Sequence, residues 1–174
     1  MQEKVDKILE KELLKTVEIP QLSLYMDQII TLMNSRENGE EKPLTKTMIN
    51  NYSKMKILEP IKGKTYPRQQ VLQLLMISIL KSTLSMEELK EVMIKLYGTD
   101  DLGEEGFEDC YKRFNTYYDS LKDDIKNLAY KLIPESDDKD AVVSLLCISL
   151  LRSRLEEISN LIIEEYFKEK KDEQ

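Results

Sequence analysis

The chain has 174 residues, of which 41% are hydrophobic and 34% are charged, and it carries a net charge of −7. This length is enough for one good hydrophobic core, or for a small domain with a helical extension. Histidine is absent, so the usual general base, the commonest zinc ligand and every Ser-His or Cys-His nucleophile pair are excluded. We therefore expect no enzyme activity, no catalytic residue, no metal site and no cofactor.

The cysteines and the apolar segments indicate the compartment. Cys110 and Cys147 form no Cys-x-x-Cys motif, which favours reduced intracellular thiols over a disulfide. The N-terminal residues alternate charged and apolar positions at helical spacing, unlike a signal peptide. The longest apolar segment, residues 141–151, is about half as long as the ~20 residues that cross a bilayer. We expect a cytoplasmic protein that does not associate with membranes.

The predicted elements begin with two helices. Helical spacing of apolar residues predicts an opening helix over residues 2–16, which ends before Pro20. A second helix is capped by Ser23 and continues to about Asn34. A polar loop then leads to Thr45, which caps a third, short helix.

The third helix covers residues 45–56 and is followed by a short segment with β propensity. The apolar residues of this helix fall on one stripe, Met48, Ile49, Tyr52 and Met55. Basic, amide and hydroxyl side chains therefore occupy the rest of its surface. Residues 61–66, centred on Lys-Gly-Lys, predict a small β-hairpin or wing.

Four further helices complete the chain. Pro67 suits the first turn of a helix that is apolar nearly all round, which predicts a place in the middle of the core. Ser85 and Glu88 form a capping box that opens the next helix. Two long amphipathic helices over about 107–133 and 138–170, joined by a short connection, predict an antiparallel helical hairpin.

The charge is distributed unevenly along the chain. Residues 1–41 carry five basic and nine acidic side chains, residues 42–81 carry eight and one, and residues 82–174 carry thirteen and twenty-three. A segment of opposite sign to its surroundings suggests contact with a polyanion. The alternative is a solvated basic face that pairs with the acidic helices of the same chain. Charge alone leaves both interpretations open.

The order of these elements resembles the winged helix-turn-helix domain of MerR-type transcription factors. The segment TKTMINNYSKMKIL stands where that family has its recognition helix, and KGKTYPRQQVLQLLMISILKSTLSMEELKEVM stands where it has its wing and the following helices. The whole pattern from IPQLSLYMDQIITLM onward also resembles an uncharacterised bacterial family, domain of unknown function 1836. The resemblance covers about residues 20–96 and implies a mainly helical, all-α fold with a β-hairpin wing.

The MerR resemblance implies a DNA-binding transcriptional regulator whose 45–56 helix enters the major groove of double-stranded DNA. Asparagine amides contact adenine, basic side chains neutralise phosphates, and a glycine lets the wing tip approach the backbone. The predicted DNA-contacting residues are Lys46, Thr47, Asn50, Asn51, Lys54, Lys56, Lys62, Gly63, Lys64 and Arg68. In the alternative interpretation the asparagines bond to local backbone and the Lys-Gly-Lys tip is only a soluble turn.

We expect three parts in the chain, an N-terminal helix (1–19), a MerR-like domain (20–98) and a C-terminal helical hairpin (104–174). The hairpin is expected to mediate homodimerisation or to hold an effector. Its two apolar stripes are able to satisfy each other inside one chain or to exchange partners across a dimer.

Two other functional classes compete with the DNA-binding regulator. The first is a non-enzymatic protein-interaction adaptor that uses the acidic C-terminal hairpin. The second is an enzyme with a cluster of acids at Asp100, Asp101, Glu104 and Glu105. An enzyme is not expected, because these acids lack a histidine, a phosphate-binding loop or a metal-ligand pattern.

Overall fold

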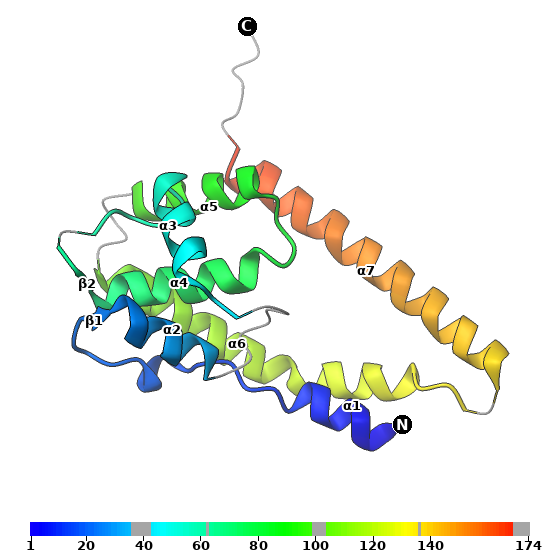
Figure 1. Ribbon diagram of the computed structural model, residues 1–174. Coiled ribbons are helices and arrows are strands. Elements are labelled where there is room, and N and C mark those ends of the chain that lie inside the picture. Colours follow the sequence, from blue (N-terminus) through cyan, green and yellow to red (C-terminus); the bar gives the residue numbers. More distant parts are fainter. Residues whose placement is uncertain (36–42, 62, 99–103, 136, 169–174) are drawn as a thin grey trace, which may run out of the picture. The chain divides into compact units, whose positions relative to one another are not determined.

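The computed structural model describes residues 1–35, 43–61, 63–98, 104–135 and 137–168, and its mainly helical architecture confirms the all-α prediction (Figure 1). The elements are, in chain order, α1 (Gln2–Leu9), the 3-10 helix η1 (Thr16–Glu18), β1 (Leu24–Tyr25), α2 (Met26–Asn34), α3 (Lys46–Lys54), β2 (Thr65–Tyr66), α4 (Arg68–Leu80), α5 (Met86–Gly98), α6 (Glu104–Lys131) and α7 (Asp138–Tyr166). They form two compact units. The central unit is Glu12–Thr116, and the terminal unit combines Met1–Lys11 with Tyr117–Gln174.

Helix α4 lies in the core of the central unit. Its buried apolar side chains point in every direction around the helix, and each of the following is at most 1% exposed: Val71, Leu72, Leu74, Leu75 and Ile77. Full burial of one such side chain contributes about 1.5–3 kcal/mol relative to exposure. The prediction of a central, buried helix from its all-round apolar pattern is therefore confirmed.

The start of α5 also follows its sequence signal. The backbone N–H of Ser85 donates to Glu88 Oε2 at 2.9 Å, and the N–H of Glu88 donates to Ser85 Oγ at 3.2 Å. This reciprocal pair satisfies two of the backbone donors that the first turn of a helix leaves without a partner. The predicted capping box is confirmed.

The N-terminal helix is shorter than predicted, because α1 ends at Leu9 rather than near residue 16. The following residues leave the helical conformation and bury Leu14 and Ile19, which are 2% and 3% exposed, in the core of the central unit. The amphipathic pattern of residues 2–16 is continuous in the sequence. Burial of Leu14 in the core of the central unit overrides this helical pattern, since tertiary packing contributes more to stability than helix propensity does.

The first half of α6 belongs to the same core. The Tyr111 hydroxyl donates to the carbonyl oxygen of Leu14 at 2.8 Å, and burial raises the pKa of Tyr111 to about 12. The division between the units therefore falls inside α6, between Thr116 and Tyr117, rather than in the loop after residue 98. It also falls after Lys11, so that residues 12–19 join the central unit.

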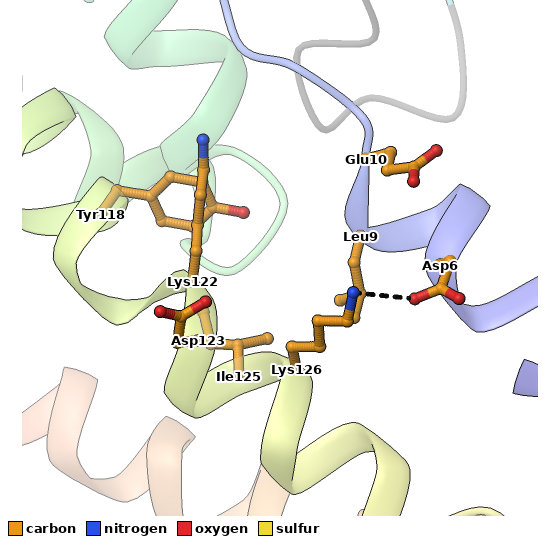
Figure 2. A pocket seen from close by; sticks show the side chains of 8 residues that line it. All are labelled: Asp6, Leu9, Glu10, Tyr118, Lys122, Asp123, Ile125 and Lys126. Carbon is orange, nitrogen blue, oxygen red and sulfur yellow. Dashed lines mark ion pairs between the residues drawn. The ribbon is translucent and has the colours of Figure 1, made fainter.

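In the terminal unit, α1 is anchored to the second half of α6 (Figure 2). Lys126 Nζ lies 3.3 Å from Asp6 Oδ1, and the Tyr130 hydroxyl donates to the same carboxylate. The Tyr130 hydrogen bond, and then Lys126, lower the pKa of Asp6. A hollow of about 160 Å³ beside this contact is lined by Asp6, Leu9, Glu10, Tyr118, Lys122, Asp123, Ile125 and Lys126. Its lining has three acids and two lysines, a mixed set of charges that identifies no particular ligand.

Helix α7 begins at a well-formed cap and exposes most of its apolar residues. Asp137 accepts hydrogen bonds from the backbone N–H groups of Lys139 and Asp140 at 2.9 and 3.0 Å. Of the described side chains of α7, Ile163 is the one that is buried. The two long helices and their short connection are present as predicted, but they do not cover each other's apolar stripes as a closed hairpin would. None of the described helices combines the length and the apolar character required to cross a bilayer.

Candidate nucleic-acid interface

Helix α3 has a buried face and a polar face. Thr45 caps the helix, and its hydroxyl accepts a hydrogen bond from the Met48 N–H at 3.3 Å. Ile49 and Tyr52 are buried, 0% and 5% exposed, and fix the helix on the core. The exposed polar positions are Lys46, Thr47, Asn50, Asn51 and Lys54. The predicted polar surface occurs, but the predicted stripe occurs only in part, because Met55 follows the end of α3 and is 37% exposed.

The end of α3 is defined by a Schellman motif. Lys56 adopts a left-handed conformation with φ of 60°, and the Ile57 N–H donates to the Tyr52 carbonyl at 2.9 Å. The Lys56 N–H donates to Ser53 O at 3.2 Å, which completes the paired bonds of this motif. The Lys56 carbonyl accepts a hydrogen bond from the Tyr97 hydroxyl of α5. These hydrogen bonds fix the backbone of Lys56, and its side chain is exposed at the end of the helix.

One residue that the sequence reasoning missed, Asn34, connects α2 to the start of α3. Its Oδ1 accepts from the Leu44 N–H at 2.8 Å, and its Nδ2 donates to the Leu44 carbonyl at 3.1 Å. Leu44 directly precedes the cap of α3 and is 5% exposed. The Asn34 amide thus satisfies both the N–H and the C=O of Leu44. This contact fixes the residue that precedes the start of α3.

The segment after α3 is held by three glutamines of α4. Gln73 accepts from the Glu59 N–H at 3.2 Å and donates to its carboxylate at 3.1 Å. Gln69 donates to the same carboxylate oxygen at 3.3 Å, and Gln70 donates to the carbonyls of Glu59 and Pro60 at 3.1 and 3.3 Å. Glu59 is the single acid of residues 42–81. Its hydrogen bonds therefore anchor the loop.

The predicted hairpin over residues 61–66 is wrong in its pairing. Strand β2 is antiparallel to β1, with Leu24 opposite Tyr66 and Tyr25 opposite Thr65. Gly63 and Lys64 therefore lead into an edge pair formed with a distant part of the chain (Figure 1). Gly63 has φ of 109° and open space around its Cα, a conformation that glycine alone adopts readily.

Most of the predicted contact residues are exposed and have no competing partner in the described chain. Lys64 and Gly63 are exposed beside β2, and Lys62 lies outside the described residues. Lys54, Lys56 and Lys64 make no ion pair with the described part of the molecule. Within the same residues, the side chains of Asn50 and Asn51 make no hydrogen bond, so the alternative that they bond to local backbone finds no support.

Lys46 is the exception on α3. Its Nζ lies 2.7 Å from Asp27 Oδ1 of α2, and the two side chains are 60% and 77% exposed. Exposed ion pairs of this kind contribute about 0–1 kcal/mol. A phosphate would therefore displace Asp27 at little cost.

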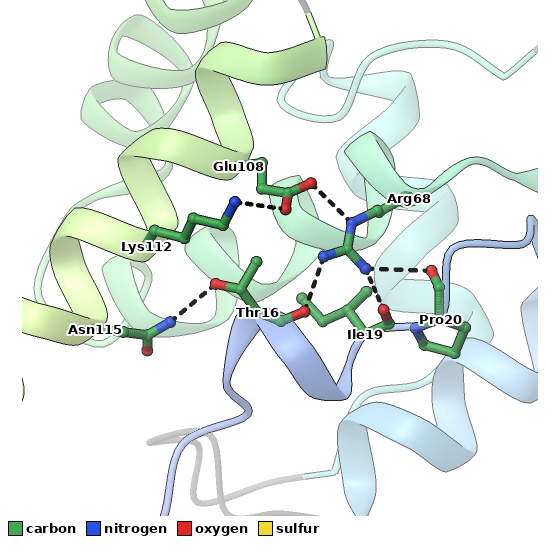
Figure 3. A network of polar contacts seen from close by, with 7 residues as sticks. All are labelled: Thr16, Ile19, Pro20, Arg68, Glu108, Lys112 and Asn115. Atoms are coloured by element: carbon green, nitrogen blue, oxygen red, sulfur yellow. Dashed lines mark hydrogen bonds and ion pairs between the residues drawn. The ribbon is translucent and has the colours of Figure 1, made fainter.

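Arg68 is placed differently from the prediction, because its guanidinium is used inside the central unit (Figure 3). Its Nε donates to Glu108 Oε2 at 3.0 Å, and its terminal nitrogens donate to the carbonyl of Thr16 at 2.8 Å and to the carbonyls of Ile19 and Pro20. The Arg68 side chain is 12% exposed. It joins the start of α4 to η1 and α6, and it is not available to a phosphate.

Glu108 completes this network. Its other oxygen, Oε1, lies 2.9 Å from Lys112 Nζ. The hydrogen bond from Arg68, followed by that from Lys112, lowers the pKa of Glu108. Asn115 extends the network by donating to the Thr16 hydroxyl at 3.2 Å. The network therefore ties the N-terminal segment of the central unit to α6.

Residues 14–114, more than half of the chain, match the family described as a domain of unknown function, DUF1836. The chain belongs to this family. No curated protein and no solved structure matches it. The first and last residues of the matched segment each lie two residues inside the limits of the central unit, Glu12–Thr116. The DUF1836 domain is thus one structural unit that contains α3 and the Arg68 network, and α7 lies outside it.

Among the described residues of the DUF1836 domain, the other chemistry-bearing side chains form no cluster. Asp100 and Asp101 lie outside the described residues, as do the side chains of Glu104 and Glu105. Burial raises the pKa of the Cys110 thiol, which lowers its reactivity. No group of three or more metal-ligating side chains occurs among the described residues. The polar face of α3 is therefore the strongest candidate surface of this domain.

Proposed function

We propose that the DUF1836 domain binds double-stranded DNA as a transcriptional regulator, with α3 in the major groove and residues 56–64 against the phosphate backbone. The observation that carries this proposal is the polar face of α3, which presents only lysine, threonine and asparagine at its exposed polar positions. Amides at Asn50 and Asn51 suit adenine, and a threonine methyl suits thymine. The flanking lysines suit phosphates.

The charges support a polyanionic partner over pairing within the chain. Lys46 and Arg68 have acidic partners, but Lys54, Lys56 and Lys64 have none among the described residues. The single acid of the segment, Glu59, is held by glutamine amides. A basic face without local counter-charges gains the most from a phosphate backbone, because counterions are released on binding.

The order of α2, α3, loop, β2 and α4 supports the MerR-like interpretation. In a winged helix-turn-helix a recognition helix follows a supporting helix, and a β element beside it contacts the backbone. Here Asn34 fixes α3 relative to α2, and Gln69, Gln70 and Gln73 fix the loop relative to α4. The surface that would meet DNA is therefore preorganised, which lowers the entropic cost of binding.

The salt dependence of binding tests the proposal. Contacts from Lys46, Lys54, Lys56, Lys62 and Lys64 to five phosphates predict a slope of log affinity against log salt of about −4.5. Fluorescence anisotropy with a duplex selected from a random pool, measured from about 50 to 200 mM salt, gives this slope. Absence of binding by the full chain at the low-salt end would refute the proposal.

A charge-matched pair of variants localises the surface. Lys54→Glu with Lys64→Glu should weaken binding at least ~30-fold, because two phosphate contacts become repulsions. Lys90→Glu with Lys131→Glu alters two exposed lysines elsewhere and changes the net charge equally, so we expect a loss of less than about threefold. Equal losses in the two variants would place the DNA elsewhere.

The asparagines are tested separately from the charge. Asn51→Ala should relax the preference for adenine at one position of the selected site by about 1–3 kcal/mol and leave the salt slope unchanged. A changed slope with an unchanged base preference would contradict the major-groove role of this face. Thr47→Ser, which removes only a methyl group, gives the matched test for a thymine contact.

A further inference from the structure

Helix α7 presents a large exposed apolar surface. Twelve large apolar side chains of α7, each 38–68% exposed, are Val142, Val143, Leu145, Leu146, Ile148, Leu150, Leu151, Leu155, Ile158, Leu161, Ile162 and Tyr166. Together they expose on the order of 1,000 Å² of apolar surface, whereas the largest patch on a typical monomer is about 300–600 Å². One partner in a standard interface contributes about 800 Å².

The pattern along α7 indicates helix pairing. Ile148, Leu151, Leu155, Ile158 and Ile162 follow steps of three, four, three and four residues, which is the seam of a left-handed helix pair. Residues 141–151 carry no charge on any side of the helix. This part requires cover on more than one side, as in the core of a helical bundle.

The terminal unit also contains an apolar cleft that continues this surface. It has a volume of about 500 Å³ and lies between α1, the end of α6 and the first turns of α7. Its lining is almost entirely apolar and includes Val5, Leu132, Ile133, Leu145 and Ile148. Ile125 and Leu128 of α6 are also 36% and 46% exposed. The same chain thus offers an exposed apolar helix and an apolar surface of matching chemistry.

We propose that α7 is the interface with a second copy of this chain, in which two terminal units form one helical bundle. A two-fold arrangement lets each α7 cover the other and the apolar surface of α6. A bilayer fits less well, because none of the described helices is long and apolar enough to cross it. Asp137, Asp138 and Asp140 also precede the apolar segment, and anionic headgroups repel acids. This inference does not depend on DNA binding by the central unit.

The oligomeric mass of the full chain tests the proposal. Light scattering after size exclusion at about 10 µM should give twice the chain mass of 20.4 kDa. Leu155→Glu should weaken the dimer at least ~100-fold, because it places charges in a desolvated seam. Leu22→Glu is the matched control, since Leu22 is 79% exposed in the central unit. It should leave the mass unchanged.

The reactivity of a cysteine in α7 measures dimer formation independently of mass. Comparison at equal helical content separates loss of the dimer from misfolding of the variant. Cys147 lies exposed in the apolar part of α7. In a Cys110→Ser background, the dimer should protect Cys147 from a thiol reagent at least ~10-fold relative to Leu155→Glu of equal helical content. A wild-type chain that is monomeric at about 100 µM overturns the proposal. A dimer that is insensitive to Leu155→Glu also overturns the proposal. A monomer that binds vesicles or an apolar dye overturns it as well.

Discussion

Replacement of Arg68 by methionine should destabilise the central unit by about 3 kcal/mol. The change removes a charged hydrogen bond to Glu108 at 3.0 Å and one to the Thr16 carbonyl at 2.8 Å. Each charged hydrogen bond contributes about 1.5–3 kcal/mol, and loss of one partner of a largely buried pair costs about 3–5 kcal/mol. Because Glu108 keeps Lys112 as a partner, the lower end of that range applies. Arg68→Lys should recover part of the loss by retaining the charge.

The matched control is Arg154→Met. Arg154 Nη1 lies 2.8 Å from Glu157 Oε2, a distance similar to those around Arg68. These side chains are 64% and 60% exposed, so the expected cost is about 0.5 kcal/mol or less. Urea unfolding followed by circular dichroism, at one fixed protein concentration, compares the two variants. Equal destabilisation would refute the reasoning, because it would show that burial of Arg68 contributes nothing.

The pH dependence of the same network has a defined sign. The pKa of Glu108 is lowered in the folded state, chiefly by the Arg68 hydrogen bond and then by Lys112. Its contribution to stability is therefore complete above the usual glutamate pKa of about 4.3, and it is lost as the pH falls through the lowered folded pKa. Glu108→Gln should be less stable than wild type at pH 7, and the difference should shrink in acid. A difference that stayed constant down to about pH 2 would contradict this assignment.

Two further substitutions test the devices that position α3. Lys56→Gly should stabilise the chain by about 0.5–1 kcal/mol, because Lys56 has φ of 60°, a conformation that costs glycine little. The same change should lower the salt slope of DNA binding by about one, because it removes one lysine. A loss of stability would show that the strain at Lys56 is absent. Asn34→Ala should destabilise the chain by about 1–2 kcal/mol in urea unfolding, because two backbone groups of Leu44 lose their partner. Asn50→Ala, at an exposed helical asparagine, is its control and should stay within about 0.5 kcal/mol of wild type.

The local features of the fold could be predicted from the sequence. The capping box of α5, the Thr45 cap of α3 and the all-round burial of α4 each depend on residues within a few positions of one another. Such signals are physical and short-range, since a side chain satisfies a nearby backbone group or an apolar stripe meets the core. The polar face of α3 was predicted for the same reason, because helical spacing alone decides which side chains share a surface.

The predictions that were wrong concern residues whose partners are distant in the chain. Arg68 was assigned to a phosphate by its residue type, but its partners lie 40 to 52 residues away in the sequence. Strand β2 was assigned to a local hairpin and pairs instead with β1, some forty residues earlier. Leu14 ends the opening helix early because it packs in a core with Tyr111, almost a hundred residues later. No local pattern carries this information, because long-range packing decides it.

The two proposals place different demands on the molecule and reinforce each other. A nine-residue α3 and a few flanking lysines give one central unit a small contact area with DNA, and single modules of that size bind weakly. A dimer through α7 would present two such surfaces joined in one molecule, so that the second contact becomes intramolecular and the affinity rises without any new contact. Two-fold symmetry of the protein then requires a site with two inverted halves. Under these two proposals, the polar face of α3 would decide which bases are preferred, and α7 would decide how strongly a two-part site is held.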